Sequence, residues 1–350
     1  MKRTLYALAL LGLASNLTHA QSNVTIYGTT DGGVRNVTNS NAAGDSKLSV
    51  GSNGIYQANR FGFMGTEDLG GGNKVKFLLE TGFNNGTGAL DNANGVLFNR
   101  SAWVSLGGAW GSLTAGRQYT IASTTVREND PFGYRYISLV PVGAGAGTTL
   151  PAAAIAAGLG ASASSGTRFS NDLQYNFTTG PVTLAAEYAA GEQVGNTRNG
   201  SAQAVAARYA DGTAQLGAAY TQKKTLAGQD NVSYIIGGGY QFGDVRLKAG
   251  HSKERQETLA AGTYSNKVSW VGAQYQITPE VELVAAVYRS RYSHVASGQR
   301  DLYIVSANYA FSKRTRLYLE VDRNLYAGAL IPATRQTGQA GISIGLNHSL

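Results

Sequence analysis

The sequence predicts an all-β fold, a closed antiparallel β-barrel of about sixteen strands that spans a membrane. Three observations predict it. Apolar and polar residues alternate with period two over most of the chain, the alternating segments run for about nine to twelve residues, and short turns between them alternate with longer polar links. Period two is typical of a strand with a different medium at each face, and a tilted strand needs about 9–11 residues to cross a bilayer.

The first twenty residues differ from the rest of the chain. Lys2 and Arg3 give a basic start, the apolar run YALALLGLA follows, and residues 18–20 end in the small residue Ala20. This pattern predicts a Sec-type signal peptide over residues 1–20, which leaves residues 21–350 as a single barrel domain. The apolar run is shorter than the roughly 18–20 residues of a transmembrane anchor. Loss of Lys2 and Arg3 lowers the formal net charge from +8 to +6.

The composition agrees with an exported barrel. Charged residues make up only 14% of the chain, Gly is abundant at 46, and there is no Cys. The absence of Cys argues against a disulfide-stapled extracellular module. Twenty Tyr against ten Phe and three Trp is an unusual aromatic balance. Tyr carries an apolar ring and a polar tip, so it suits a boundary between hydrocarbon and water.

The stretch RLYLEVD, residues 316–322, shows the alternation most clearly, with apolar side chains on one face and polar ones on the other. In a membrane barrel the apolar face contacts lipid and the polar face lines the water-filled interior. The residues predicted to contact lipid are Leu317, Leu319 and Val321. Similar alternation recurs at residues 171–178, 181–188, 214–220, 232–242, 245–249, 281–287, 303–311 and 342–350.

The connections fall into two classes. Tight turns are predicted at residues 68–73, 107–111, 179–181, 211–212, 243–244, 278–280 and 312–313, and longer links lie between them. This asymmetry is typical of outer-membrane barrels, whose short turns face the periplasm and whose long loops face outward. A secreted sandwich with its apolar face turned inward would also show period two, although its strands are usually nearer 5–6 residues.

Several segments resemble the trimeric general porins of Gram-negative bacteria, especially the beta-proteobacterial type. The segments that carry the likeness are QSNVTIYGTTDGGV, NRFGFMGTEDLGGGNKVKFLLETGF (59–83), FNRSAWVSLGGAWGSLTAGRQY (98–119) and RFSNDLQYNF (168–177). The resemblance implies a sixteen-stranded homotrimeric barrel in the outer membrane, in contact with lipid and lipopolysaccharide. It also implies that a third loop, about residues 120–166, folds into the lumen and narrows it.

In such porins acidic groups on the third loop face arginines on the opposite wall. The residues assigned to the constriction are Arg60 in NRFGF, Arg100 in FNRSAW, Arg168 in TRFSND, Arg117 in GRQY, and Glu128, Asp130 and Arg135 in VRENDPFGYR. The residues predicted to line the pore elsewhere are Lys74, Lys76, Glu80, Arg316, Glu320 and Asp322.

Strand parity agrees only partly with these assignments. Arg60 alternates with Phe61 and Phe63, which predicts that it faces water. Arg100 shares its parity with Ala102 and Val104, so simple alternation places it on the lipid side. The resemblance places Arg100 inward.

The chain departs from the family pattern at two places. No Glu stands between Pro131 and Phe132, where the family has a Pro-Glu-Phe-Gly-Gly stretch on the third loop. The family usually ends in an aromatic residue, which helps the assembly machinery to recognise the terminal strand, and this chain ends in Leu350. Leu350 continues the apolar face of that strand, so the fold is expected to be the same.

The sequence predicts a channel for passive diffusion of small hydrophilic solutes and ions, and not an enzyme. The histidines left after residue 20 have no metal-ligand spacing, no G-x-S-x-G motif occurs, no cofactor is implied, and the basic residues form no nucleic-acid patch. The basic chain and its arginines predict a preference for small anions. A substrate-specific channel for a sugar or an anion, and a barrel adhesin, remain alternatives. Most Tyr residues fall on lipid-side parity, with Tyr288 and Tyr318 as exceptions.

Overall fold

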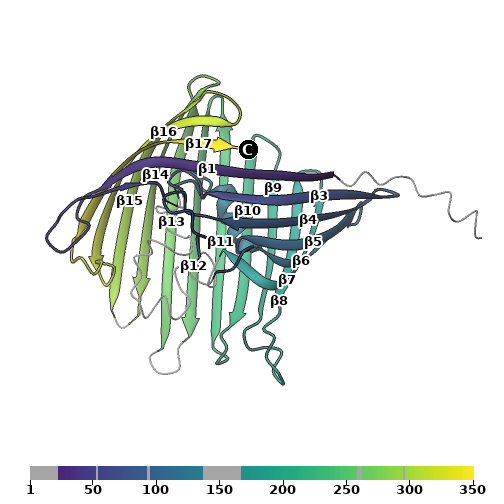
Figure 1. Cartoon of the computed structure of the whole chain (residues 1–350). Helices are drawn as coiled ribbons and strands as arrows, with labels where there is room; N and C mark the ends of the chain where they lie inside the picture. The colour runs from purple at the N-terminus through teal and green to yellow at the C-terminus, as the bar shows by residue number, and fades with distance from the viewer. Residues whose placement is uncertain (1–22, 53, 93–94, 137–166, 258–261, 295) are drawn as a thin grey trace, which may run out of the picture.

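The structure is a computed structural model that describes residues 23–52, 54–92, 95–136, 167–257, 262–294 and 296–350. Residues 1–20, the predicted signal peptide, lie outside the described residues, as do residues 137–166 of the predicted constriction loop. The described chain forms one antiparallel sheet of seventeen strands with a short helix inside it (Figure 1).

Sixteen of the seventeen strands are long, at 8–15 residues, and the first strand and the six between residues 230 and 328 exceed the expected nine to twelve. The seventeenth is the short strand β2. The elements are β1 (Asn23–Val37), β2 (Lys47–Val50), β3 (Arg60–Gly70), β4 (Asn73–Gly82), β5 (Ser101–Gly108), β6 (Gly111–Tyr119), α2 (Ile121–Asn129), β7 (Arg168–Thr179), β8 (Val182–Ala189), β9 (Ala202–Ala210), β10 (Ala214–Lys224), β11 (Asp230–Phe242), β12 (Val245–Glu257), β13 (Thr263–Gln276), β14 (Val281–Ser293), β15 (Ser297–Ala310), β16 (Thr315–Gly328) and β17 (Gly338–Ser349).

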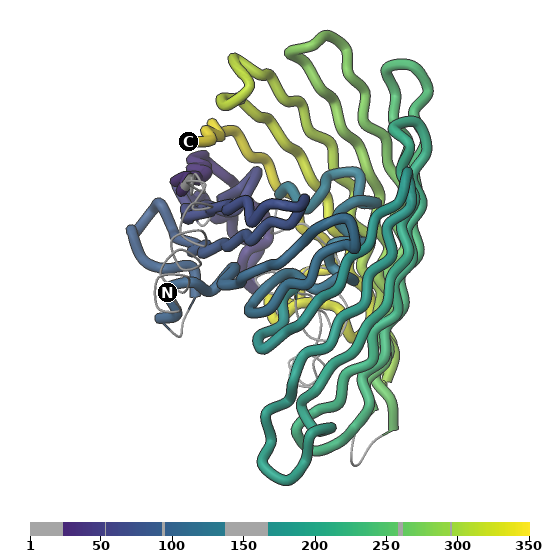
Figure 2. The backbone as a smooth tube through the Cα atoms, turned by 90° about the vertical axis from the view of Figure 1, so that its right-hand side faces the viewer, coloured from purple at the N-terminus to yellow at the C-terminus, as the bar shows by residue number. Residues whose placement is uncertain are grey.

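The barrel closes through β1, which changes partner along its length. Its first half, from Asn23 to Thr29, pairs with β3, and its second half, from Thr29 to Val37, pairs with β17. The short strand β2 adds to the end of β1. Figure 2 shows the yellow C-terminal strand beside the purple N-terminal one. Closure leaves no free sheet edge, and this is the condition under which a sheet can span hydrocarbon.

The apolar face of the strands points outward, as the sequence predicts. Leu317, Leu319 and Val321 are 39%, 44% and 50% exposed on the outer surface. The intervening Tyr318 and Glu320 are fully buried inside. Since a soluble sandwich would bury the leucines and expose the carboxylate, the observed orientation favours the membrane barrel.

Eight of the thirteen exposed aromatic side chains of the described residues lie at one end of the outer surface, beside the tight turns of the sheet, which we call the short-turn end. They are Trp110, Tyr175, Tyr209, Tyr240, Phe242, Tyr275, Tyr309 and Phe311. Such a ring is typical of the level where a bilayer meets water. Within the described residues, no helix is long and apolar enough to cross a membrane.

The inner wall is not polar all round. A buried apolar strip runs over the inner faces of β8–β15, and it includes Ala204, Ala219, Ile235, Val268 and Ile304. Alternation alone predicts polar side chains at these inward positions. Apolar residues stand there because helix α2 packs on β8–β12, and the residues that follow it, Phe132 and Tyr136, belong to the same buried cluster, so that water is excluded from this part of the wall.

We predict that Val321→Arg, at the middle of β16, lowers the free energy of unfolding by about 2–4 kcal/mol, because an outward arginine at mid-depth contacts hydrocarbon. Urea unfolding in lipid vesicles, followed by tryptophan fluorescence, measures this. The control Val321→Leu keeps an apolar side chain in lipid and is expected to change the stability little. Equal stability of the two variants would mean that Val321 contacts water.

Candidate functional site

Residues 120–136, which we call the inner segment, leave β6 and fold into the barrel. The Thr120 hydroxyl accepts a hydrogen bond from the Ser123 N–H at 3.0 Å and caps helix α2. A Glu187 carboxyl oxygen on β8 accepts from the Ile121 N–H at 3.3 Å, which gives a free N–H at the helix N-terminus a partner. The sequence did not predict this helix because its Thr and Val residues are weak helix formers.

The other end of α2 is held by side chains from the barrel wall. Lys248 donates to the Glu128 carbonyl oxygen at 2.8 Å, and Trp270 Nε1 donates to the Asn129 carbonyl at 3.0 Å. The last carbonyls of a helix have no partner within it, so these donors satisfy groups that would otherwise be buried unpaired. The charge of Lys248 also suits the negative end of the helix dipole.

Two wall glycines allow the helix to approach the sheet closely. A Cβ atom at Gly237 would lie 2.6 Å from the Asn129 Cβ, and one at Gly217 would lie 2.9 Å from the Asn129 Nδ2. Side chains at these inward positions of β10 and β11 would therefore displace the inner segment.

Asp130 does not face the pore, contrary to the sequence prediction. It is 2% exposed, accepts from the Tyr134 N–H at 2.9 Å and accepts a second hydrogen bond from the Tyr288 hydroxyl. Burial raises the pKa of Asp130, although the two hydrogen bonds act in the opposite direction. This carboxylate anchors the inner segment to β14. The sequence could not reveal this because Tyr288 lies 158 positions away.

Glu128 also differs from its predicted role. Its carboxylate pairs with Arg208 on β9 at 3.0 Å, and the two line a cavity on the short-turn side of the helix. It does not line the cavity that holds Arg60, Arg100 and Arg168. Neither Glu128 nor Asp130 therefore faces the wall arginines to which the resemblance assigned them, and Glu128 faces a different wall arginine, Arg208.

The inner segment is also fixed near its far end. The Arg135 guanidinium lies 2.8 Å from the Glu282 carboxylate and donates to the Tyr56 hydroxyl at 2.9 Å. Burial alone would lower the pKa of Arg135, but Tyr56 and Glu282 outweigh it and raise the pKa. Tyr56 belongs to residues 54–59, which also lie against the inner wall. Its ring stacks on the Tyr318 ring, with 5.5 Å between the ring centres. No sequence pattern indicated this second inward segment.

Five arginines surround a cavity of about 270 Å³ between the inner segment and the wall. They are Arg60, Arg100, Arg127, Arg135 and Arg168, and we call them the arginine cluster. Arg60, Arg100 and Arg168 come from the wall, as the resemblance implied. Arg127 and Arg135 come from the inner segment, so basic groups lie on both sides of the cavity.

Tyr119, at the end of β6, holds two arginines of the cluster. Its hydroxyl accepts from Arg100 at 2.9 Å and also from Arg168. The Arg168 guanidinium lies 3.9 Å from the centre of the Tyr119 ring, within the range of a cation–π interaction. Sequence reasoning singled out the GRQY element but missed this role of its tyrosine.

The cluster is only partly neutralised. Arg100 lies 2.8 Å from Glu80 and 3.6 Å from Asp91. No carboxylate of the described part of the chain lies within 4 Å of the Arg60, Arg127 or Arg168 guanidinium. A cavity with uncompensated guanidinium groups in a low-dielectric surrounding attracts anions.

Simple alternation fails at Arg100 but holds at Arg117. Arg100 precedes the first residue of β5, so the alternation of side chains along the strand does not apply to it. Its side chain turns inward and is buried. Arg117 stands opposite Ala102, on the outward parity of β5, and donates to the Ser170 hydroxyl at 2.8 Å. Arg117 does not line the cavity of the arginine cluster, contrary to its assignment to the constriction.

The predicted pore-lining residues divide into three groups. Lys74 and Lys76 are exposed and line a larger cavity near the short-turn end. Arg316 donates to the Tyr56 hydroxyl at 2.6 Å. Glu320 and Asp322 face inward, and their carboxylate oxygens lie 2.9 Å and 2.6 Å from the Arg35 guanidinium. Both are buried beneath Arg35, so they do not contact the open channel. Glu80 is likewise buried against Arg100.

The arrangement offers a polar cavity with anion-attracting groups. Among the described residues, no group of three or more His, Cys, Asp or Glu side chains is arranged to hold a metal ion. The hydrogen-bonded arginines present fixed donors to a passing solute, and guanidinium groups are matched in geometry to carboxylate and phosphate.

Comparisons with known proteins agree on one family. A family model described as Gram-negative porin matches residues 7–329. Outer membrane porin protein 32 of Delftia acidovorans is 32% identical, and the match covers 100% of both chains. The anion-selective porin from Comamonas acidovorans has a similar fold, with a TM-score of 0.75 at 23% identity, over 94% of this chain and 100% of that one. The trimer form of OmpT from Vibrio cholerae has a TM-score of 0.66 at 14% identity, and the match covers 94% of this chain and 99% of that one.

We predict that Asp130→Ala loosens the inner segment. The change leaves the Tyr288 hydroxyl and the Tyr134 N–H without an acceptor, at a cost of about 1–3 kcal/mol. Single-channel recording should then show a larger mean conductance and more open-channel noise. Glu128→Gln is the matched control, because that side chain is 45% exposed and anchors nothing buried. An unchanged Asp130→Ala recording would show that Asp130 does not hold the segment.

Proposed function

We propose, from the premise that this chain belongs to the family of Gram-negative porins, that its channel passes small anions in preference to cations. The channel lies in the outer membrane, and small hydrophilic solutes cross it by passive diffusion. The observation that carries the proposed preference is the arginine cluster, which has basic groups on both sides of the passage.

The charges around the passage support this preference. Arg60, Arg127 and Arg168 have no carboxylate within 4 Å in the described part of the chain, and the two acids of the inner segment are turned away from them. A cation that enters the passage is repelled from the wall and from the inner segment alike. An anion is attracted by both, and the low-dielectric walls strengthen this effect.

The assembly and the remaining boundaries are part of the same proposal. We propose a homotrimer in contact with lipopolysaccharide, a signal peptide at residues 1–20 and a constriction loop at about residues 120–166. The trimer form of OmpT, a structural neighbour, supports the trimer. The inward course of residues 120–136 supports the loop assignment.

We predict that the double variant Arg60→Gln/Arg168→Gln lowers the chloride-to-potassium permeability ratio by about threefold or more, because it removes two unpaired charges from the narrow passage. Reversal potentials in a potassium chloride gradient across planar bilayers measure the ratio.

The single variant Arg198→Gln is the control for this experiment, since Arg198 is exposed on the link between β8 and β9. Its ratio should equal that of the wild type. A wild-type reversal potential that favours potassium would contradict the proposed selectivity, and a silent membrane would contradict the channel itself.

A further inference from the structure

We propose a second binding site in this channel, between the arginine cluster and the short-turn end, that takes aromatic carboxylates. The site lies on the inner wall of β3–β6, and it goes beyond the proposed anion preference while resting on the channel function. Its elements are an apolar surface, two unpaired lysines and a set of hydroxyl groups.

The strand register brings these elements together in three neighbouring rows across the inner wall. The first row is apolar and consists of Met64, Leu78 and Trp103. The second row is Thr66, Lys76, Ser105 and Thr114. The third row is Asp68, Lys74, Gly107 and Ser112. Successive rows are two residues apart along each strand, so the apolar surface and the two amino groups are adjacent.

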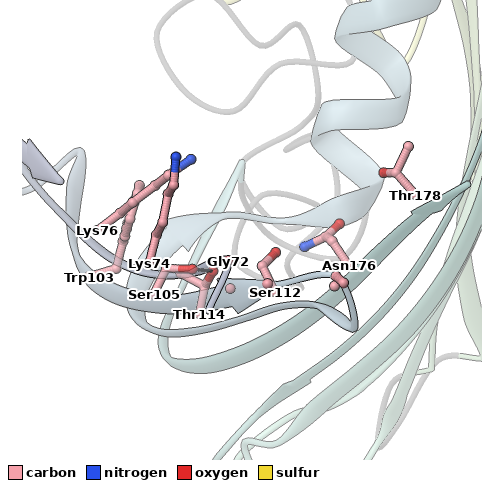
Figure 3. Close-up of a pocket in the computed structure, with 13 residues that line it drawn as sticks. Gly72, Lys74, Lys76, Trp103, Ser105, Ser112, Thr114, Asn176 and Thr178 are labelled. Carbon is pink, nitrogen blue, oxygen red and sulfur yellow. Dashed lines mark hydrogen bonds between the residues drawn. The ribbon is translucent and has the colours of Figure 1, made fainter. Parts of the chain in front are cut away.

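The part of these rows that lies on β4–β6 borders open space. A cavity of about 540 Å³ is lined by Trp103, both lysines and the hydroxyl-bearing residues Ser105, Ser112 and Thr114. Gly107 and Gly111 also line the cavity and add no side chain to it. Figure 3 shows the amino groups of Lys74 and Lys76 extending in the same direction from the strand, with Trp103 beside them. The volume suits a small organic molecule.

The two lysines are available to a ligand. Both are exposed, and no carboxylate of the described residues lies within 4 Å of either amino group. Asp68 stands directly across from Lys74, but its Oδ1 accepts a hydrogen bond from the Gly70 N–H at 2.9 Å in the turn. Among the residues that the structure describes, no acid lines the cavity. Two ammonium groups without a counter-ion favour an anionic ligand.

The apolar row is unusual for a channel wall and gives the site its chemical class. Met64 is 38% exposed although it lies on the inward parity of β3. Trp103 and Leu78 continue this surface across β4 and β5. A flat ring can pack on the Trp103 indole while a carboxylate on that ring reaches the lysines one and two rows away. The Ser105 and Thr114 hydroxyls, which bond each other at 2.8 Å, border the same space.

We test the site by block of the potassium chloride current in planar bilayers, with sodium benzoate, sodium acetate, sodium phosphate and benzyl alcohol as probes. For the wild type, benzoate is expected to reach half-block at a concentration about fivefold or more below that of acetate. Trp103→Leu should remove this difference, and Trp103→Phe should keep it because it restores a ring. Lys74→Gln/Lys76→Gln should raise the half-blocking benzoate concentration by about threefold to tenfold.

Lys313→Gln is the matched control, because Lys313 is exposed on the tight turn between β15 and β16 and lies outside the cavity. It should leave benzoate block unchanged. Equal half-block by benzoate and acetate in the wild type would overturn the site. Block by benzyl alcohol that is as strong as block by benzoate would also overturn the site. The same holds if phosphate blocks at the same concentration as benzoate and the Trp103→Leu variant leaves this phosphate block unchanged. Failure of the channel function is distinct, since it removes the current before any probe is added.

Discussion

The constraint on which the rest of this structure depends is that hydrocarbon offers no hydrogen-bond partner to a polypeptide backbone. The sheet therefore has to close on itself, and the double pairing of β1 with β3 and β17 achieves this. Closure turns one face of every strand toward lipid and the other toward an enclosed space. The alternation of apolar and polar residues, the aromatic ring at the short-turn end and the inward charges all follow from that geometry.

The enclosed space has its own internal core. Helix α2 and residues 54–59 cover an apolar strip of the inner wall, and wall side chains satisfy the helix carbonyls. Asp130 serves this docking and is buried against β14, whereas Glu128 is half-exposed and pairs with Arg208 on the short-turn side of the helix. Neither carboxylate is therefore available to neutralise the arginine cluster. The packing of one segment thus determines the electrostatics of the passage.

The sequence predicted the features that are local or that belong to the family. Strand period and length predicted the barrel and the outward face of Leu317 and Leu319, and short motifs identified three arginines of the cluster. Alternation failed where a residue lies outside a regular strand, as for Arg100, and the family motif misplaced Arg117, which stands on an outward position of its strand. The buried roles of Asp130 and Glu320 could not be predicted, because each depends on a partner far away in the sequence, Tyr288 and Arg35. Docking of the inner segment depends on many such partners at once.

The seam between β1 and β17 has a consequence for how the molecule forms. The Asn347 side chain donates to Asp31 at 3.2 Å across a sequence separation of 316 residues, and Asp31 also accepts from Tyr318 at 2.8 Å. Contacts of such separation are entropically costly and slow to form, whereas each of the other strands has a hairpin neighbour close by. The pairing of successive hairpins should therefore produce a curled, open sheet first. The final joining of the seam is then the rate-limiting event, during which two unpaired edges would need shelter from other chains.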